Sequence, residues 1–281
     1  MRLQDIARSA VAAAPVILGA AAAAAADKPA VDKEAVDKAF EALKTFDWGT
    51  GIDMTGKGKV PQDQGVLKAI DGAVVATYGD AAARKELETR LAAVLKTGAS
   101  RAAKDFVCRK LTIIGTAESV PALAALLPYK DLSHMSRYAL ERICAPEAAA
   151  AMRDALPKVS GAIKIGVIGS LGARRDAASV AAVTPLLADS DKAVACAAAA
   201  ALGAIGTPEA ATALCDCAKK ATEGVKAAAA DASLACAERL LAEGKKAEAI
   251  GLYKALAGED QPKHVRLAAT RGLLAAAGKK E

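Results

Sequence analysis

The chain has 281 residues, of which 53% are hydrophobic but only 3% aromatic, and its formal net charge is +6. A core of alanine and leucine with so few rings suits thin stacked helices better than a β-sandwich or barrel, and no alternating apolar and polar run predicts a strand. The modest positive charge is expected of a solvated lysine-rich surface, although it also favours acidic partners. Without a long basic block or interleaved aromatic residues, nucleic-acid binding is not expected.

Residues 1–26 have the order of a secretory signal peptide. Arg2 and Arg8 precede an uncharged apolar run from Val11 to Ala25, and Ala26 completes an A-x-A cleavage site. We expect cleavage near Ala26 and a periplasmic or secreted bacterial protein without stable membrane insertion. The alternative is an uncleaved anchor, although the run is short and mostly alanine for a bilayer span.

The segment 27–64 is predicted to form an N-terminal helix, an aromatic cap and a loop. The helix runs from Glu34 to Lys44, and Phe46 and Trp48 follow it. We interpret the aromatic residues as a cap over the open end of a helix stack, because an end repeat must shield its core. The alternative is an aromatic docking patch.

The loop from Thr50 to Gln64 contains a partial phosphate-binding motif. Residues 51–57 fit its first seven positions, but Gly58 stands where a serine or threonine should hold magnesium. No apolar strand precedes the segment, and Pro61 interrupts any following helix that could direct its dipole at a phosphate. We therefore predict no nucleotide and no other cofactor.

Residues 65–281 are predicted to form an all-α, right-handed α-solenoid of stacked two-helix repeats. The clearest copy spans Ala193 to Leu214, where apolar residues recur at three- and four-residue steps. Gly206 ends the first helix in a left-handed conformation, and Thr207 caps a second helix that begins at Pro208. Such a hairpin cannot bury its own apolar face, so it requires neighbours.

Looser copies of this turn recur along the chain. Successive turns are 29, 28, 34, 38 and 34 residues apart, which is the range of two-helix solenoid repeats. The predicted turn residues are Gly115, Cys144, Gly172, Gly206, Gly244 and Gly278. An earlier helical pair, Gly65–Tyr78 and Asp80–Lys96, precedes them.

The phrases IGTAESVPALAALL at residues 114–127 and ALGAIGTPEAATAL at residues 201–214 resemble HEAT-type repeats, specifically the short class named for phycobilisome lyases. The whole chain also resembles uncharacterised exported bacterial HEAT-repeat proteins. The valine-arginine pair usual early in the first helices of this family occurs at Val265-Arg266, whereas Ala195 follows Val194. Residues 237–256, AERLLAEGKKAEAIGLYKAL, are similar to a tetratricopeptide helix pair. Members of the HEAT family mostly act as scaffolds or peptide binders, and a few are chromophore lyases.

Few side chains suggest a catalytic or metal-binding site. His134 and His264 lie in no metal-chelating spacing, so no metal site is predicted. Gly166 to Gly172 resembles a nucleophile elbow around Ser170, but Ile168 stands where the motif requires glycine. Charged residues near the turns are expected to pair along the stack, with ligand clamping as the alternative: Arg137, Arg174, Arg175, Arg266, Asp131, Asp189 and Asp191.

The six cysteines lie in apolar helical segments, where a thiol replaces a small apolar residue. They are Cys108, Cys144, Cys196, Cys215, Cys217 and Cys236. Most are expected to be buried free thiols, although an exported chain permits disulfides. Cys196 and Cys236 are the pair to test first for a bridge.

Because stacked hairpins form an extended concave surface, we expect an exported, non-enzymatic scaffold or adaptor that binds a protein or peptide there. One alternative is a lyase-like enzyme or enzyme subunit related to phycobilisome-lyase HEAT proteins, which would need a thiol or carboxylate cluster. The other is a self-associating structural envelope component. The sequence assigns no catalytic, cofactor-binding or metal-binding residue and leaves the partner-binding residues open.

Overall fold

A computed structural model describes residues 31–47, 64–259 and 261–278, and every regular element in these ranges is helical. The predicted signal peptide, Trp48 and the partial phosphate-binding motif lie outside the described residues. Among the described helices, none is long and apolar enough to cross a membrane.

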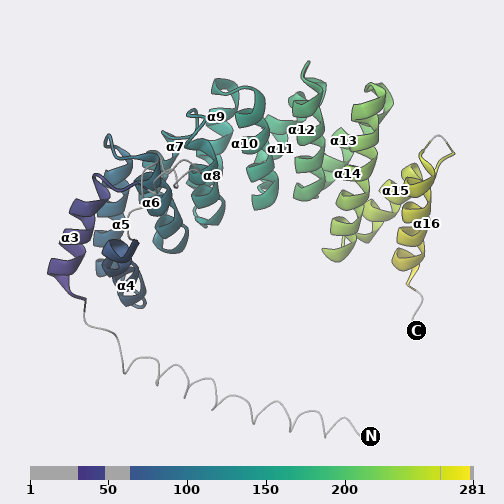
Figure 1. The fold of residues 1–281 in the computed structure, drawn as a ribbon. Helices are drawn as coiled ribbons and strands as arrows, with labels where there is room; N and C mark the ends of the chain where they lie inside the picture. Colours follow the sequence, from purple (N-terminus) through teal and green to yellow (C-terminus); the bar gives the residue numbers. More distant parts are fainter. Residues whose placement is uncertain (1–30, 48–63, 260, 279–281) are drawn as a thin grey trace, which may run out of the picture.

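The helices form two layers in one row that is bent into an arch (Figure 1). Each helix of the first layer contacts the next helix of that layer. The first layer contains α4 (Lys68–Ala76), α6 (Arg101–Ile114), α8 (Ser133–Arg142), α10 (Gly161–Arg174), α12 (Lys192–Ile205), α14 (Glu223–Ala242) and α16 (Lys263–Ala277). The second layer contains α5 (Ala81–Leu95), α7 (Val120–Ala124), α9 (Pro146–Ala155), α11 (Val180–Val183), α13 (Pro208–Lys220) and α15 (Lys246–Leu256). The predicted all-α solenoid is confirmed.

Short 3₁₀ segments interrupt the second layer. The predicted second helix after Gly115 is divided into η2 (Ala117–Ser119) and α7, and the one after α10 into η4 (Ala177–Ser179), α11 and η5 (Thr184–Ala188). Pro185 explains the change at α11, because its ring removes a backbone donor and clashes with a continuing α-helix. Two further 3₁₀ segments are η1 (Gln64–Leu67) and η3 (Leu156–Lys158).

One predicted turn is wrong. Gly172 lies inside α10, and the left-handed residue that ends this helix is Arg175, with φ of 55°. The turns at 115, 144, 175 and 206 are then 29, 31 and 31 residues apart, a more regular period than the sequence pattern gave. Gly206 has the predicted left-handed conformation, with φ of 71°, whereas Gly115 has φ of −63° and ends α6 in an extended conformation.

Two glycines inside the first-layer helices, Gly172 and Gly203, serve close packing. A Cβ atom at Gly172 would lie 2.8 Å from the Cα atom of Ala201 in α12. A Cβ atom at Gly203 would lie 2.6 Å from the carbonyl oxygen and 2.9 Å from the Cα atom of Ala232 in α14. A glycine facing an alanine therefore brings the backbones of consecutive repeats into contact.

The N-terminal helix α3 (Lys33–Leu43) covers one end of the row, where it packs on α4 and η1. Asp32 caps it by accepting a hydrogen bond from the Ala35 N–H group. Phe46, just after the helix, is fully buried. Phe40 is half-buried, and the Arg90 guanidinium lies 4.1 Å from its ring centre. Phe40 and Phe46 therefore pack at this end of the row, whereas Trp48, the other residue of the predicted cap, lies outside the described residues.

We expect Gly203→Ala to destabilise the protein by about 1–3 kcal/mol, because the added methyl group has no room against the α14 backbone. Gly169→Ala is the matched control in α10, where an added Cβ would meet no neighbouring heavy atom within 4 Å. It should stabilise the protein by about 0.5–1 kcal/mol through helix propensity. Urea unfolding followed by circular dichroism measures both changes, and two shifts of the same sign would contradict the packing argument.

Candidate protein-binding groove

An open groove lies between the second-layer segments of two consecutive repeats. One wall is formed by η4, α11 and η5, and the other by α13. The groove consists of two hollows of about 650 and 500 Å³, both of which are lined by Thr184, Pro185, Ala213 and Asp216. It lies where the regular second layer is interrupted.

The two walls of the larger hollow differ in chemistry. The first wall presents small, mostly apolar residues, namely Ala177, Ala178, Val180, Ala181, Thr184 and Pro185. The α13 wall presents Glu209, Thr212, Ala213 and Asp216, which recur at helical spacing and so share a face. An apolar wall thus faces an acidic stripe.

The two carboxylates of this stripe are exposed. Hydrogen bonds from its own backbone N–H group and from the Thr207 hydroxyl hold the pKa of Glu209 below its usual range. Glu209 is therefore ionised at neutral pH. Asp216 has a contact with Lys219 at 3.6 Å, in which both side chains are largely exposed. Such a contact neutralises little charge, because solvent screens it.

The smaller hollow carries charges of both signs. Lys192 and Lys220 line it together with Asp189 and Asp216, and the start of α14 closes one side. Asp189 lies 3.4 Å from the ammonium group of Lys164. The pKa of Asp189 is lowered, mainly because its carboxylate accepts a hydrogen bond from the Asp191 N–H group. Glu209 therefore lines only the larger hollow, whereas Asp216 lines both hollows and has lysines near it in the smaller one.

Sequence reasoning missed this groove. The available signal was Pro185 within a segment predicted to be helical, because proline in a helix interior marks a break. A break does not reveal what the neighbouring helix presents to the opened space, and that depends on the packing of α13.

Two of the arginines singled out in the sequence, Arg137 and Arg174, bind the backbone of a neighbouring repeat. Arg137 donates to the Gly166 carbonyl and to the Ser170 hydroxyl across the contact of α8 with α10. Arg174 caps the C-terminal end of α8, whose last carbonyls lack partners within the helix. Its guanidinium donates to the carbonyl oxygens of Leu140, Glu141, Ile143 and Ala145.

The other candidate residues are spread over separate repeats. Asp131 accepts a hydrogen bond from Arg101 through its carbonyl, Asp191 caps α12, and Arg266 lies near the start of α16. Ser170, the centre of the elbow-like motif, is buried, and its hydroxyl donates to Glu141. The side chains of Asp191 and Ser170 therefore have structural contacts.

The two histidines lie in α8 and α16. The Nε2 atom of His264 is 3.2 Å from a carboxylate oxygen of Asp231 in α14, at an exposed position. Over residues 31–47, 64–259 and 261–278, no group of three histidine, cysteine or acidic side chains is placed to hold a metal ion.

All six cysteines lie in the described ranges and are free thiols. Cys108, Cys217 and Cys236 are buried, Cys196 and Cys215 are half-buried, and Cys144 is exposed. Burial raises the pKa of Cys108 to about 12 and that of Cys236 to about 11. In the pair singled out for a bridge, the nearest polar contacts are backbone carbonyls, Gly224 for Cys196 and Thr207 for Cys236.

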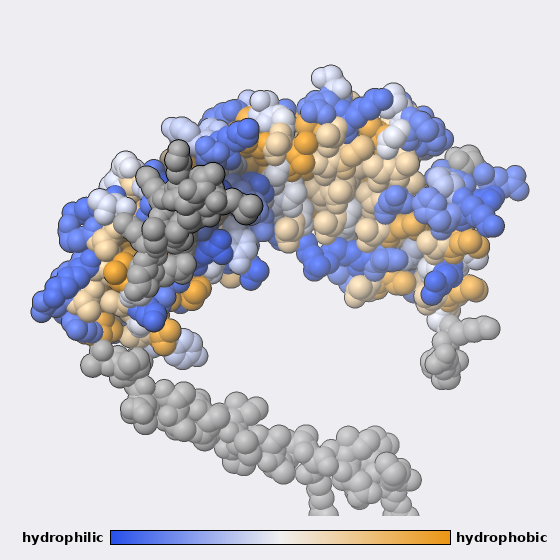
Figure 2. All heavy atoms as spheres, in the orientation of Figure 1, coloured by the Kyte–Doolittle hydropathy of each residue, from blue (hydrophilic) through white to orange (hydrophobic). Residues whose placement is uncertain are grey.

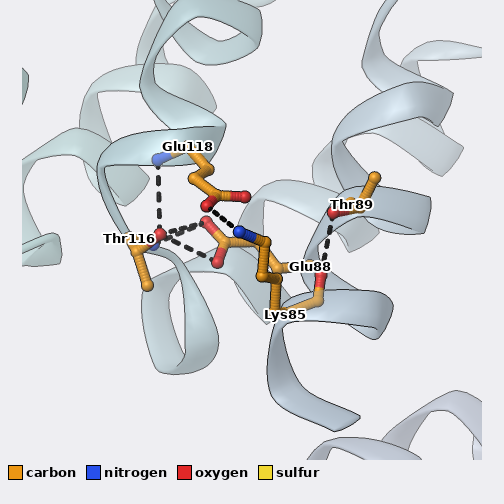
Figure 3. A network of polar contacts seen from close by, with 5 residues as sticks. All are labelled: Lys85, Glu88, Thr89, Thr116 and Glu118. Carbon is orange, nitrogen blue, oxygen red and sulfur yellow. Dashed lines mark hydrogen bonds and ion pairs between the residues drawn. The ribbon is translucent and has the colours of Figure 1, made fainter. Parts of the chain in front are cut away.

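A buried carboxylate connects α5 to the next repeat (Figure 3). Glu88 is only 2% exposed and accepts hydrogen bonds from the backbone N–H group of Thr116, at 2.6 Å, and from its hydroxyl. Lys85 and Glu118 form an ion pair beside it at 2.6 Å, but both are well exposed. The network fixes the turn after α6 against α5.

A broad apolar area covers the part of the molecule that holds α12 to α14 (Figure 2). Several exposed residues of the first-layer helices α10 and α12 are small, for example Gly169, Ala173, Ala200 and Ala204.

A match to a family model agrees with this architecture. Residues 158–235, which run from the end of η3 into α14, match a family model described as HEAT repeats. This part of the chain is therefore similar to HEAT repeats, and it lies within the row of stacked helices. The narrower resemblance to the phycobilisome-lyase class stays a prediction.

Two solved structures, each titled an engineered protein of the Northeast Structural Genomics Consortium, are similar to this chain. The first has a TM-score of 0.39 and 18% identity, and the match covers 86% of this chain and 68% of the other. The second has a TM-score of 0.35 and 19% identity, with coverages of 74% and 96%. No curated protein matches this sequence.

We expect Glu88→Ala to destabilise the protein by about 1–3 kcal/mol, because the backbone N–H group and the hydroxyl of Thr116 lose a charged acceptor. Lys85→Ala, which removes only the exposed ion pair of the same network, should leave the urea midpoint nearly unchanged. Equal losses of stability in the two variants would show that the buried carboxylate has no special role.

We expect alkylation of the reduced native protein by iodoacetamide at pH 8 to modify Cys144 first, because its side chain is exposed. Cys108 and Cys236 should react only after denaturation, since both burial and a raised pKa suppress the thiolate. Peptide mass spectrometry over a time course measures the order. Early modification of Cys108 in the folded protein would contradict the packing of α6.

Proposed function

We propose that this chain is an exported, non-enzymatic scaffold that binds a protein or peptide partner on the surface of its stacked repeats. A row of stacked repeats offers an extended surface, and HEAT repeats commonly mediate protein interactions. Export is proposed from the signal-like order of residues 1–26.

The observation that carries the binding proposal is the groove beside α13. It has two adjoining hollows of about 650 and 500 Å³, each within the range of ligand sites, and its walls combine apolar and charged residues. The polar residues that would be candidates for chemistry instead hold repeats together, as Arg174 and Glu88 do. This favours a binding role over a catalytic one.

A pull-down with the mature chain, tagged at its C-terminus and recovered from its native envelope, tests the proposal. We expect one protein at a stoichiometric amount, which then binds the purified chain in calorimetry. Mass spectrometry of the recovered chain should place its first residue at Asp27. Recovery of a bound chromophore, turnover of a substrate, or recovery of the chain with itself alone would contradict a scaffold that binds a partner.

A further inference from the structure

The larger hollow of the groove beside α13 presents a negative charge that opposes the charge of the chain as a whole. The only charged residues that line the larger hollow are Glu209 and Asp216, whereas the chain has a net charge of +6. The carboxylates are seven residues apart, which is about 10 Å along a helix axis. They face the small apolar residues of η4 and α11 across the hollow.

We propose that the groove between α11 and α13 binds a short segment of a protein partner that carries both apolar side chains and lysine or arginine. This inference rests on the proposed function and names the chemistry of the partner segment. Apolar side chains bury against Ala177, Val180, Ala181 and Pro185, and the basic groups reach Glu209 and Asp216. Two lysines four positions apart in an extended segment span the two carboxylates, because their long stems are flexible.

Charge complementarity selects this occupant over an acidic segment. An acidic segment would be attracted by the positive net charge of the chain but repelled at the larger hollow. A preference for basic peptides is therefore opposite to what the overall charge favours, and it can arise only from a local acidic site.

The chain supplies a matched control for the two carboxylates. Glu147 and Asp154 of α9 stand at the same places in their helix as Glu209 and Asp216 in α13, one and eight residues after the initial proline. They are exposed and line neither hollow of the groove. Reversing either pair changes the net charge and the helix N-terminus in the same way.

The test uses fluorescence anisotropy with two labelled peptides, LKALLKAL and LEALLEAL, and the purified mature chain. We expect the basic peptide to bind more tightly than the acidic one. Glu209→Lys together with Asp216→Lys should weaken binding of the basic peptide by about tenfold, because two attractions become repulsions. Glu147→Lys together with Asp154→Lys should leave it within about twofold, because those positions lie outside the groove.

A further variant tests the apolar wall. Ala181→Trp places a large ring on an exposed position of α11. The ring should block the larger hollow and so weaken binding of the basic peptide, while the urea midpoint stays unchanged. Tighter binding of the acidic peptide, no binding of either peptide, or equal losses in the groove and control pairs would overturn the proposal. None of these results depends on the envelope pull-down, which tests partner binding by itself.

Discussion

The contact between consecutive first-layer helices is the constraint on which the structure depends. At Gly172 and Gly203 the backbone of one repeat approaches an alanine of the next so closely that even one methyl group would meet the neighbouring main chain. This approach is possible only if both helices carry very small side chains there, since packed interiors leave no spare volume. The alanine-rich composition follows from this requirement.

Because the first layer fixes the spacing of the repeats, the second layer is free to vary. Pro185 breaks the second helix of one repeat into α11 and η5, whereas α13 in the next repeat is continuous. The difference leaves the groove and exposes the Glu209–Asp216 stripe, while the corresponding acids of α9 line no part of it. An interruption in a single repeat thus gives a repetitive fold a distinct local surface.

Polar side chains join consecutive repeats at the helix ends, where apolar contacts cannot satisfy the backbone N–H and carbonyl groups. Glu88 satisfies the N–H group of Thr116 at the start of η2, and Arg174 satisfies carbonyls at the end of α8. Helix ends carry backbone groups without internal partners, and leaving them buried and unpaired is costly. These residues therefore join one repeat to the next, which explains why charged side chains near the turns need not mark a ligand site.

The sequence by itself determined the helical class, the two-helix repeat and the turn at Gly206, because apolar periodicity and helix caps are local signals. It misassigned Gly172, since a glycine in a helical pattern can either end a helix or admit a neighbour, and only the approach of α12 decides between them. The existence and lining of the groove were also visible only in the tertiary structure. Its two walls come from separate repeats, so no local pattern could place Ala181 opposite Asp216.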